Sequence, residues 1–321
     1  MRRNFEVPGR AEALLAALEA MGAAPEMAPT APREALLAVH DEGYVAFLAE
    51  AAEAWAALPE KGPEVVANMH PAPEMLAQGA TMASGIVGRT GWYTADTACP
   101  IGPGSWESIL GAASCALAAA DVAAQGGTTY ALSRPPGHHA YAARAGGHCY
   151  VNNSALAAEH LRRAGAKRVA VIDIDAHHGN GTQGIFWERG DVLTVSVHGD
   201  PAGYYPWYVG YAGETGGGAG AGCNLNLPLP QGSGDDAWLE AVAAAAARAR
   251  EFGAEALVVP LGFDASEHEP LSYLRVSADG FARAGAMLSG LGLPTAVVQE
   301  GGYNAEKIGG LLERFLTGWG R

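Results

Sequence analysis

Two adjacent histidines, His138 and His139, are the residues of this chain best suited to move protons at neutral pH. They follow an extended run at residues 128–133, and the Arg-Pro-Pro-Gly sequence between that run and the histidines predicts a rigid turn. Two imidazoles in one turn can accept a proton from water and deliver one to a leaving group. The pair therefore indicates general acid and base chemistry.

Residues of metal-ligand type follow the next strand pattern. The β-branched run at 169–174 contains Asp173, and Asp175 and His177 lie just after it. Because alternate side chains of a strand point the same way, we expect the two carboxylates to converge on one point, with His177 just beyond. Asp264 ends another apolar run, which begins near residue 256. Three oxygen and nitrogen ligands leave a position free for water and substrate, so the pattern predicts the catalytic zinc site of a hydrolase.

The composition limits the partners of such a site. The chain has 20 Lys and Arg residues against 34 Asp and Glu residues, which gives a formal net charge of −14. An acidic surface repels phosphate backbones and anionic lipid, so neither nucleic acid nor a membrane is an expected partner. The charge suits a cationic substrate, and it equally suits ordinary acidic solubility.

The cysteine spacing and the N-terminal sequence indicate the cellular compartment in which the protein is expected. Cys99, Cys115, Cys149 and Cys223 are widely spaced and form no C-x-x-C motif. This spacing argues against both a disulfide framework and a thiolate zinc site. The chain shows no basic and apolar leader and no uncharged run of about 20 residues, so we expect a cytoplasmic protein.

Alternating strand and helix patterns predict the scaffold. Strands are expected at residues 128–133, 168–174, 191–197, 256–261 and 295–299. Helices are expected at 10–21, 40–58, 107–124 with Ser105 as cap, 155–164, 235–252, 278–291 and 306–319. These repeats predict an α/β fold with a largely parallel central sheet and helices on both faces. In such sheets ligands bind at the carboxyl ends of the strands, where the residues named above lie.

The length of 321 residues fits a single catalytic domain over residues 1–321. Two stretches, 59–91 and 199–230, are expected to be long loops, and loops of that length are usually functional. The glycine-rich segment at 216–220 lacks the Lys and Ser or Thr that follow in a phosphate-binding loop, so we interpret it as turn-rich backbone.

Taken together, an ordered set of motifs resembles the zinc-dependent deacetylases of the histone deacetylase and arginase fold, most closely their bacterial acetylpolyamine amidohydrolase branch. The resemblance runs from about Phe5 to the C-terminus. Its most specific segments are residues 134–139, 146–153, 173–183, 198–201, 262–264 and 300–303. It implies a single-domain deacetylase fold. Relatives have a β-strand before the segment that matches residues 5–10, so either the sheet lacks that strand or the start of this chain has been placed late.

The resemblance also implies roles for individual residues. It implies one Zn²⁺ per chain, held by Asp175, His177 and Asp264. His138 and His139 become the general base and acid, in an order that the sequence does not decide, and Tyr303 becomes the hydroxyl donor to the oxyanion.

Residues around the two histidines are assigned in the same way. The resemblance implies that Asp173 holds His138 and that Asn180 faces His139. Asp173 together with Ser196 would bind a structural K⁺ or Na⁺. His178, beside a ligand, points the other way from the strand end and is interpreted as structural.

The rim of the substrate tunnel departs from the family pattern. Tyr205 matches one aromatic wall, whereas His148, next to Gly147, stands where relatives have Phe or Tyr. Asp96 matches a rim acid that grips the substrate, but Val87 falls where polyamine enzymes have a second acid. That replacement argues against a strong preference for polyamines. The loop at 59–91 resembles an insertion that pairs two subunits, which predicts a homodimer acting on small molecules.

Several functions remain open from the sequence. The first is a zinc amidohydrolase that removes acetyl or short acyl groups from small amines such as acetylpolyamines. A hydrolase of other amides or esters, such as xenobiotic carboxamides, or a deacetylase of protein acetyl-lysine would differ only at the rim. A non-catalytic protein that keeps the fold would have lost a metal ligand or Tyr303, and all are present. An arginase-type enzyme would need a second set of metal ligands, which the sequence does not show.

Overall fold

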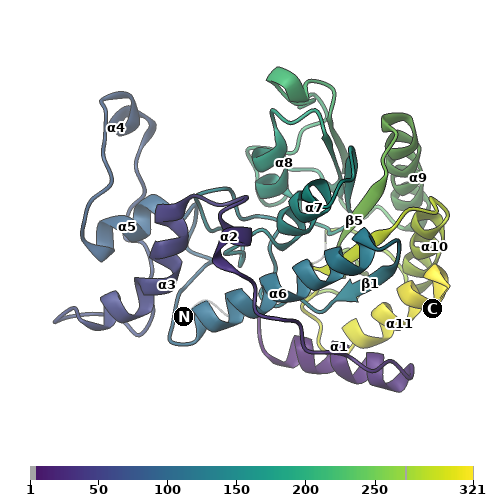
Figure 1. Cartoon of the computed structure of the whole chain (residues 1–321), viewed down its shortest axis with the longest axis horizontal. Coiled ribbons are helices and arrows are strands. Elements are labelled where there is room, and N and C mark those ends of the chain that lie inside the picture. Colours follow the sequence, from purple (N-terminus) through teal and green to yellow (C-terminus); the bar gives the residue numbers. More distant parts are fainter. Residues whose placement is uncertain (1–4, 272, 321) are drawn as a thin grey trace.

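A parallel six-stranded sheet forms the centre of the protein, in a computed structural model that describes residues 5–271 and 273–320 (Figure 1). The strand order is β1-β6-β5-β2-β3-β4, and every neighbouring pair is parallel. The strands are β1 (Thr128–Ala131), β2 (Val169–Asp173), β3 (Val192–Gly199), β4 (Asn224–Leu229), β5 (Ala256–Leu261) and β6 (Thr295–Gln299). The central strands are fully buried and rich in Val, Leu and Ile, as expected for a parallel sheet covered on both faces.

Helices cover both faces of this sheet, which confirms the predicted α/β architecture. Alternate residues of each strand face opposite ways, so Ile172 packs in one core cluster and Val171 in another. The first cluster lies under α1 (Gly9–Ala20), α9 (Asp235–Phe252), α10 (Ala278–Ser289) and α11 (Ile308–Trp319). The second lies under α6 (Ser105–Ala124), α7 (Asn153–Arg163) and α8 (Asn180–Phe186).

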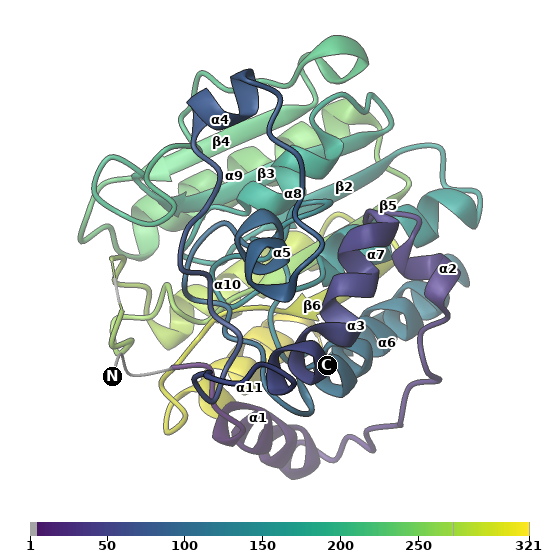
Figure 2. The ribbon, with the colours of Figure 1, turned by 90° about the vertical axis from the view of Figure 1, so that its left-hand side faces the viewer.

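A third cluster of buried residues belongs to the N-terminal part of the chain. It joins α3 (Glu42–Ala56) and α5 (Ile86–Tyr93) to α6, with α2 (Arg33–Leu36) beside it. Between α3 and α5 the chain extends away from the body and carries the short helix α4 (Pro73–Ala77) (Figure 1). Figure 2, in which this part faces the viewer, shows α3, α4 and α5 in front of the sheet. We call residues 59–85 the arm.

Most predicted elements form close to their expected limits, and the differences have local causes. The segment 199–230 was expected to be a loop, but it contains β4. This strand lies at the edge of the sheet, and its outer side pairs with no other strand among the described residues, so it tolerates Pro228. The expected loop at 59–91 contains α4 and most of α5. Ser105 does not cap α6 but begins it, since its Oγ accepts from the N–H of Gly102 and Gly104 holds the cap position with φ of 83°.

Of the described helices, α6 alone is long and apolar enough to cross a bilayer by length and composition. It is a core helix, because Ala113, Ala116 and Ala120 are completely buried and it packs along α7 and β1. All four cysteines are free, as the spacing predicted.

Candidate active site

The carboxyl ends of four neighbouring strands bring the chemically active residues together. The turn with His138 and His139 follows β1, and the segment with Asp175 and His177 follows β2. Asp264 comes three residues after β5, and the segment 300–303 follows β6. Since β1, β6, β5 and β2 are adjacent and parallel, their ends meet at one edge of the sheet.

Asp175, His177 and Asp264 form a compact set of possible metal ligands. One ligand atom from each lies within 4.8 Å of the other two. Nδ1 of His177 is 2.9 Å from Oδ2 of Asp264 and 3.2 Å from Oδ1 of Asp175. Both carboxylates are completely buried. Two buried carboxylates need a compensating cation, and two oxygens and one imidazole nitrogen are a donor set that suits a catalytic divalent metal.

Backbone N–H groups orient these two carboxylates. The N–H of Gly301 donates to Oδ2 of Asp175 at 2.8 Å, and the N–H of Ala176 donates to Oδ1 of Asp264 at 2.9 Å. In each case the other oxygen is turned toward His177. A Cβ on Gly262 would lie 2.0 Å from Oδ2 of Asp175, so only glycine fits there. The donors are thus preorganised, which favours tight metal binding.

Asp173 does not belong to this set, so the expectation that it converges with Asp175 on one point was wrong. β2 ends at Asp173, and Asp175 lies in the irregular segment after it, where strand alternation no longer holds. Oδ2 of Asp173 is 2.9 Å from Nδ1 of His138, whose Nε2 is 3.8 Å from Oδ1 of Asp175. Burial by itself lowers the pKa of His138, but the charges of Asp173 and Asp175 outweigh burial and hold the pKa well above its ordinary value.

His139 has a contrasting environment. Its Nδ1 donates to Oδ1 of Asn180 at 2.6 Å, and its ring lies 4.0 Å from that of His138. Burial, with the neighbouring His138 and His177, lowers the pKa of His139 well below its ordinary value. An amide partner adds no charge, whereas the carboxylate beside His138 favours the imidazolium form. The two rings therefore differ in how readily they hold a proton.

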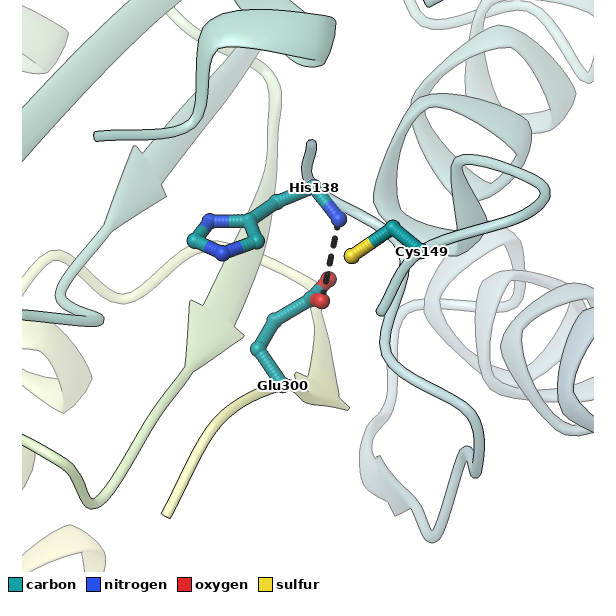
Figure 3. A group of neighbouring side chains, drawn as sticks. All are labelled: His138, Cys149 and Glu300. Carbon is teal, nitrogen blue, oxygen red and sulfur yellow. Dashed lines mark hydrogen bonds between the residues drawn. The ribbon is translucent and has the colours of Figure 1, made fainter. Parts of the chain in front are cut away.

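A second group that combines metal-ligand types surrounds the backbone of His138. It consists of His138, Cys149 and Glu300 (Figure 3). The imidazole of His138 points away from the other two side chains in Figure 3. Oε2 of Glu300 accepts from the N–H groups of Gly137 and His138, and its Oε1 accepts from the hydroxyl of Ser154. The carboxylate is occupied by these donors, so this group anchors the histidine turn.

Tyr303 follows two glycines after β6. Its ring lies 4.8 Å from the guanidinium carbon of Arg10 and meets the ring of His148 edge-on at 5.9 Å. Burial raises the pKa of Tyr303 well above its ordinary value, so its phenol keeps its proton. A protonated phenol is a hydrogen-bond donor. Arg10 also donates to the carbonyl groups of Gly302 and Glu300 at 2.5 and 2.6 Å, a contact that sequence patterns do not reveal.

The predicted rim residues also lie together. The ring of Tyr205 meets that of His139 edge-on at 4.9 Å, and its hydroxyl donates to Oδ2 of Asp96 at 2.7 Å. The same oxygen accepts from the N–H of Gly147 at 3.0 Å. A Cβ on Gly147 would lie 2.3 Å from the ring of His139, so this position also needs glycine. Nδ1 of His148 donates to the carbonyl of Ala98 at 2.9 Å.

Other predicted residues lie farther out or beside the site. Val87, in the first turn of α5, is 37% exposed, so a side chain there is accessible to solvent. Ser196 and Asp173 line one small cavity. His178 bonds to Gln183 through Nε2 at 2.9 Å, which agrees with its interpretation as structural.

Tyr204 is a residue that sequence reasoning missed. Its ring stacks on that of His177 at 4.4 Å with an interplanar angle of 15°, and Tyr273 stacks on its other face at 4.7 Å. The stack fixes the plane of the His177 imidazole. In the sequence, only the position of Tyr204 next to the predicted wall residue Tyr205 could have indicated that it belongs to the site.

Comparison with known proteins adds independent findings. A family described as the histone deacetylase domain matches residues 4–318. The chain is 42% identical to the acetylpolyamine amidohydrolase of Mycoplana ramosa, over 98% of this chain and 92% of that protein. It is 43% identical to the acetylpolyamine amidohydrolase of Burkholderia pseudomallei, over 100% and 92%.

Solved structures agree with these matches. The crystal structure of acetylpolyamine aminohydrolase from Burkholderia pseudomallei has a TM-score of 0.95 and 42% identity, covering 100% of this chain and 92% of that one. The HDA15 HD domain has a TM-score of 0.82 and 28% identity, covering 100% and 86%.

Proposed function

The chain belongs to the histone deacetylase family, and on that premise we propose that it hydrolyses the amide bond of acetylated polyamines and similar small acylated amines. The observation that carries the proposal is the meeting of three elements at one edge of the sheet. These are the buried ligand set, the paired histidines and the protonated phenol of Tyr303. We also propose that residues 1–321 form one catalytic domain and that the protein is cytoplasmic.

We propose zinc as the metal, held by Asp175, His177 and Asp264. When bound, zinc polarises the amide carbonyl and acidifies a water molecule, whose pKa can fall to about 7. The Asp173 and Ser196 pair, which lines the small cavity, is our proposed site for a structural K⁺ or Na⁺. The metal ligands themselves come from two strand ends and so depend on the intact sheet.

The remaining chemistry is carried by side chains of the chain. His138 and His139 take the proton from water and supply one to the departing amine, which cannot leave as an anion. Asp173 and Asn180 fix the two imidazoles in place through their Nδ1 atoms. The hydroxyl of Tyr303 donates to the carbonyl oxygen as negative charge develops there.

We propose that Tyr205 and His148 form the walls of the substrate tunnel, with Asp96 and Gly147 at its rim. Asp96 already accepts hydrogen bonds from Tyr205, Gly147 and the N–H of Ala98. Its carboxylate is therefore held rigidly, and its charge faces a rim that a cationic substrate must pass.

A substrate panel tests the proposed function. Purified, zinc-loaded protein is assayed with acetylated diamines, acetyl-lysine peptides, and neutral amides and esters. The proposal expects the highest kcat/KM with acetylated diamines. Faster hydrolysis of xenobiotic carboxamides or esters would favour the alternative activity, and the absence of turnover on the whole panel would refute both.

The next prediction concerns Val87 and the preference of the enzyme for cationic over neutral substrates. A carboxylate beside a partly desolvated ammonium typically contributes about 1–3 kcal/mol, which is roughly 5–150-fold in kcat/KM. Because Val87 offers no such charge, we expect weak discrimination between an acetylated diamine and a neutral N-alkyl acetamide of equal length. Val87→Glu should raise that ratio, measured at physiological ionic strength.

Val122→Glu is the matched control. Val122 lies on α6 and is similarly exposed, and its substitution by Glu adds the same net charge as Val87→Glu. If both variants change the ratio equally, the effect comes from diffuse charge, which salt screens. A wild-type preference for the diamine above about 100-fold would show that selectivity is built elsewhere.

We propose that the protein is a homodimer that pairs through the arm. Several large apolar side chains are exposed on or next to it, namely Met69, Met75, Leu76, Met82 and Val87. An apolar group of this kind on an extended segment is typical of an interaction surface. Sedimentation equilibrium should give twice the chain mass, and a monomer at micromolar concentration would contradict the proposal.

A further inference from the structure

The segment that carries Tyr303 has little rigidity of its own. Tyr303 is preceded by Gly301 and Gly302, and Gly302 has φ of 110°, a conformation open mainly to glycine. A backbone with two consecutive glycines depends on neighbouring groups to hold the phenol in place. Since a misplacement of about 1 Å can cost about 10²-fold in rate, the contacts that hold Tyr303 matter for catalysis.

One carboxylate holds the backbone at Tyr303 itself. Oε1 of Glu269 accepts from the N–H of Tyr303 at 2.7 Å, and Oε2 accepts from the N–H of Asn304 at 3.2 Å. Glu269 is only 7% exposed. Both oxygens of one buried carboxyl group accept from consecutive backbone N–H groups, so this double contact anchors the segment.

The position of Glu269 is itself fixed by the segment that begins at the metal ligand Asp264. The N–H of Glu269 donates to the carbonyl of Ser266 at 3.1 Å, and the N–H of Ser266 donates to that of Phe263. On the other side, Asn304 donates through Nδ2 to the carbonyl of His268 at 2.8 Å. Hydrogen bonds therefore join the turn after β5 to the turn after β6 at two consecutive residues, Tyr303 and Asn304.

We propose that Glu269 is a positioning residue that sets the place of the Tyr303 hydroxyl relative to the metal ligands. The inference rests on the proposed function, in which that hydroxyl stabilises developing charge. Glu269 does not touch the substrate in this account. It acts on the rate by fixing the backbone from which the phenol projects.

A double-mutant cycle tests the proposal. Glu269→Gln keeps the size of the side chain but places an amide N–H₂ against one of the two donors. We expect kcat to fall about 10-fold with little change in KM and with full zinc content, because the hydroxyl acts on charge that develops in the transition state. In a Tyr303→Phe background the same substitution should cost less than about 2-fold, because residues that act as a unit are not additive.

Glu267→Gln is the matched control, since Glu267 is a neighbouring glutamate with a 44% exposed side chain that pairs with the exposed His268. It should leave kcat within about 2-fold of the parent, as surface substitutions usually do. Equal losses from Glu269→Gln in both backgrounds, or no loss in the parent, would overturn the proposal. Absence of turnover in the parent would instead refute the proposed function. The role of Glu269 in positioning Tyr303 would then be tested by a second measurement.

That measurement does not depend on turnover. With 3-fluorotyrosine at position 303, the ¹⁹F resonance should be single in the zinc-loaded parent and shifted or broadened in Glu269→Gln. If Glu269→Gln does not fold, Glu269→Asp replaces it, because it keeps the charge and moves the carboxylate back by one methylene. An unchanged resonance in a folded Glu269 variant would show that the backbone of Tyr303 is held without it.

Discussion

His177→Ala should lose both bound zinc and all measurable deacetylase activity. The proposed ligand set consists of three side chains, and a site with three protein ligands cannot spare one, because ligand loss removes both a donor and the enclosing geometry. Asp264→Ala should behave in the same way. It also leaves the N–H of Ala176 without its acceptor and removes the nearer of the two carboxylate oxygens beside Nδ1 of His177.

The measurement is metal content by mass spectrometry of the purified variant, alongside turnover of an acetylated diamine. His160→Ala is a suitable control, since His160 pairs with Asp121 on the exposed side of α7. It should retain zinc and activity. Full activity in either ligand variant at one zinc per chain would mean that the metal is held elsewhere.

Tyr303→Phe should lower kcat by about 10²-fold to 10³-fold, the usual effect of losing one donor to a developing oxyanion. Zinc content should not change, because Tyr303 is not among the ligands. KM should also change little, since the hydroxyl acts most strongly on the transition state.

Tyr208→Phe is the matched control, because Tyr208 is 90% exposed and loses the same hydroxyl. It should leave both parameters near those of the parent. A Tyr303→Phe effect confined to KM would mean that the ring is only a wall of the pocket.

The strand and helix patterns predicted much of the scaffold, because its central strands are short buried runs and its long helices have clear ends. Helix α9 and strands β5 and β6 form at the predicted limits. β4 was missed because an edge strand with Pro228 and two asparagines has the composition of a loop. The helices of the arm region were missed because they are short and lie among turn residues.

The candidate site was predictable where residues are close in sequence or follow the carboxyl ends of predicted strands. His138 with His139, and Asp175 with His177, are close in sequence, and Asp264 was predicted because it ends an apolar strand pattern. Contacts made across the fold left no local signal. Examples are the grip of Glu269 on the backbone of Tyr303, the stacking of Tyr204 on His177, and the position of Arg10 against the segment after β6. Strand alternation failed at Asp175 because the strand had already ended.

The strand order has a consequence for how activity appears during folding. The N–H of Gly137 and the carboxylate of Glu300, which hold the histidine turn, are 163 residues apart in sequence. Pairing parallel strands closes large loops, and the chain loses conformational entropy before the stabilising contacts form. Such topologies have high contact order and therefore fold slowly. Only a segment that spans residues 137–300 contains both partners, and the site is complete only when β6 lies between β1 and β5. Recovery of turnover after dilution from denaturant therefore reports the long-range pairing of β6 rather than early collapse.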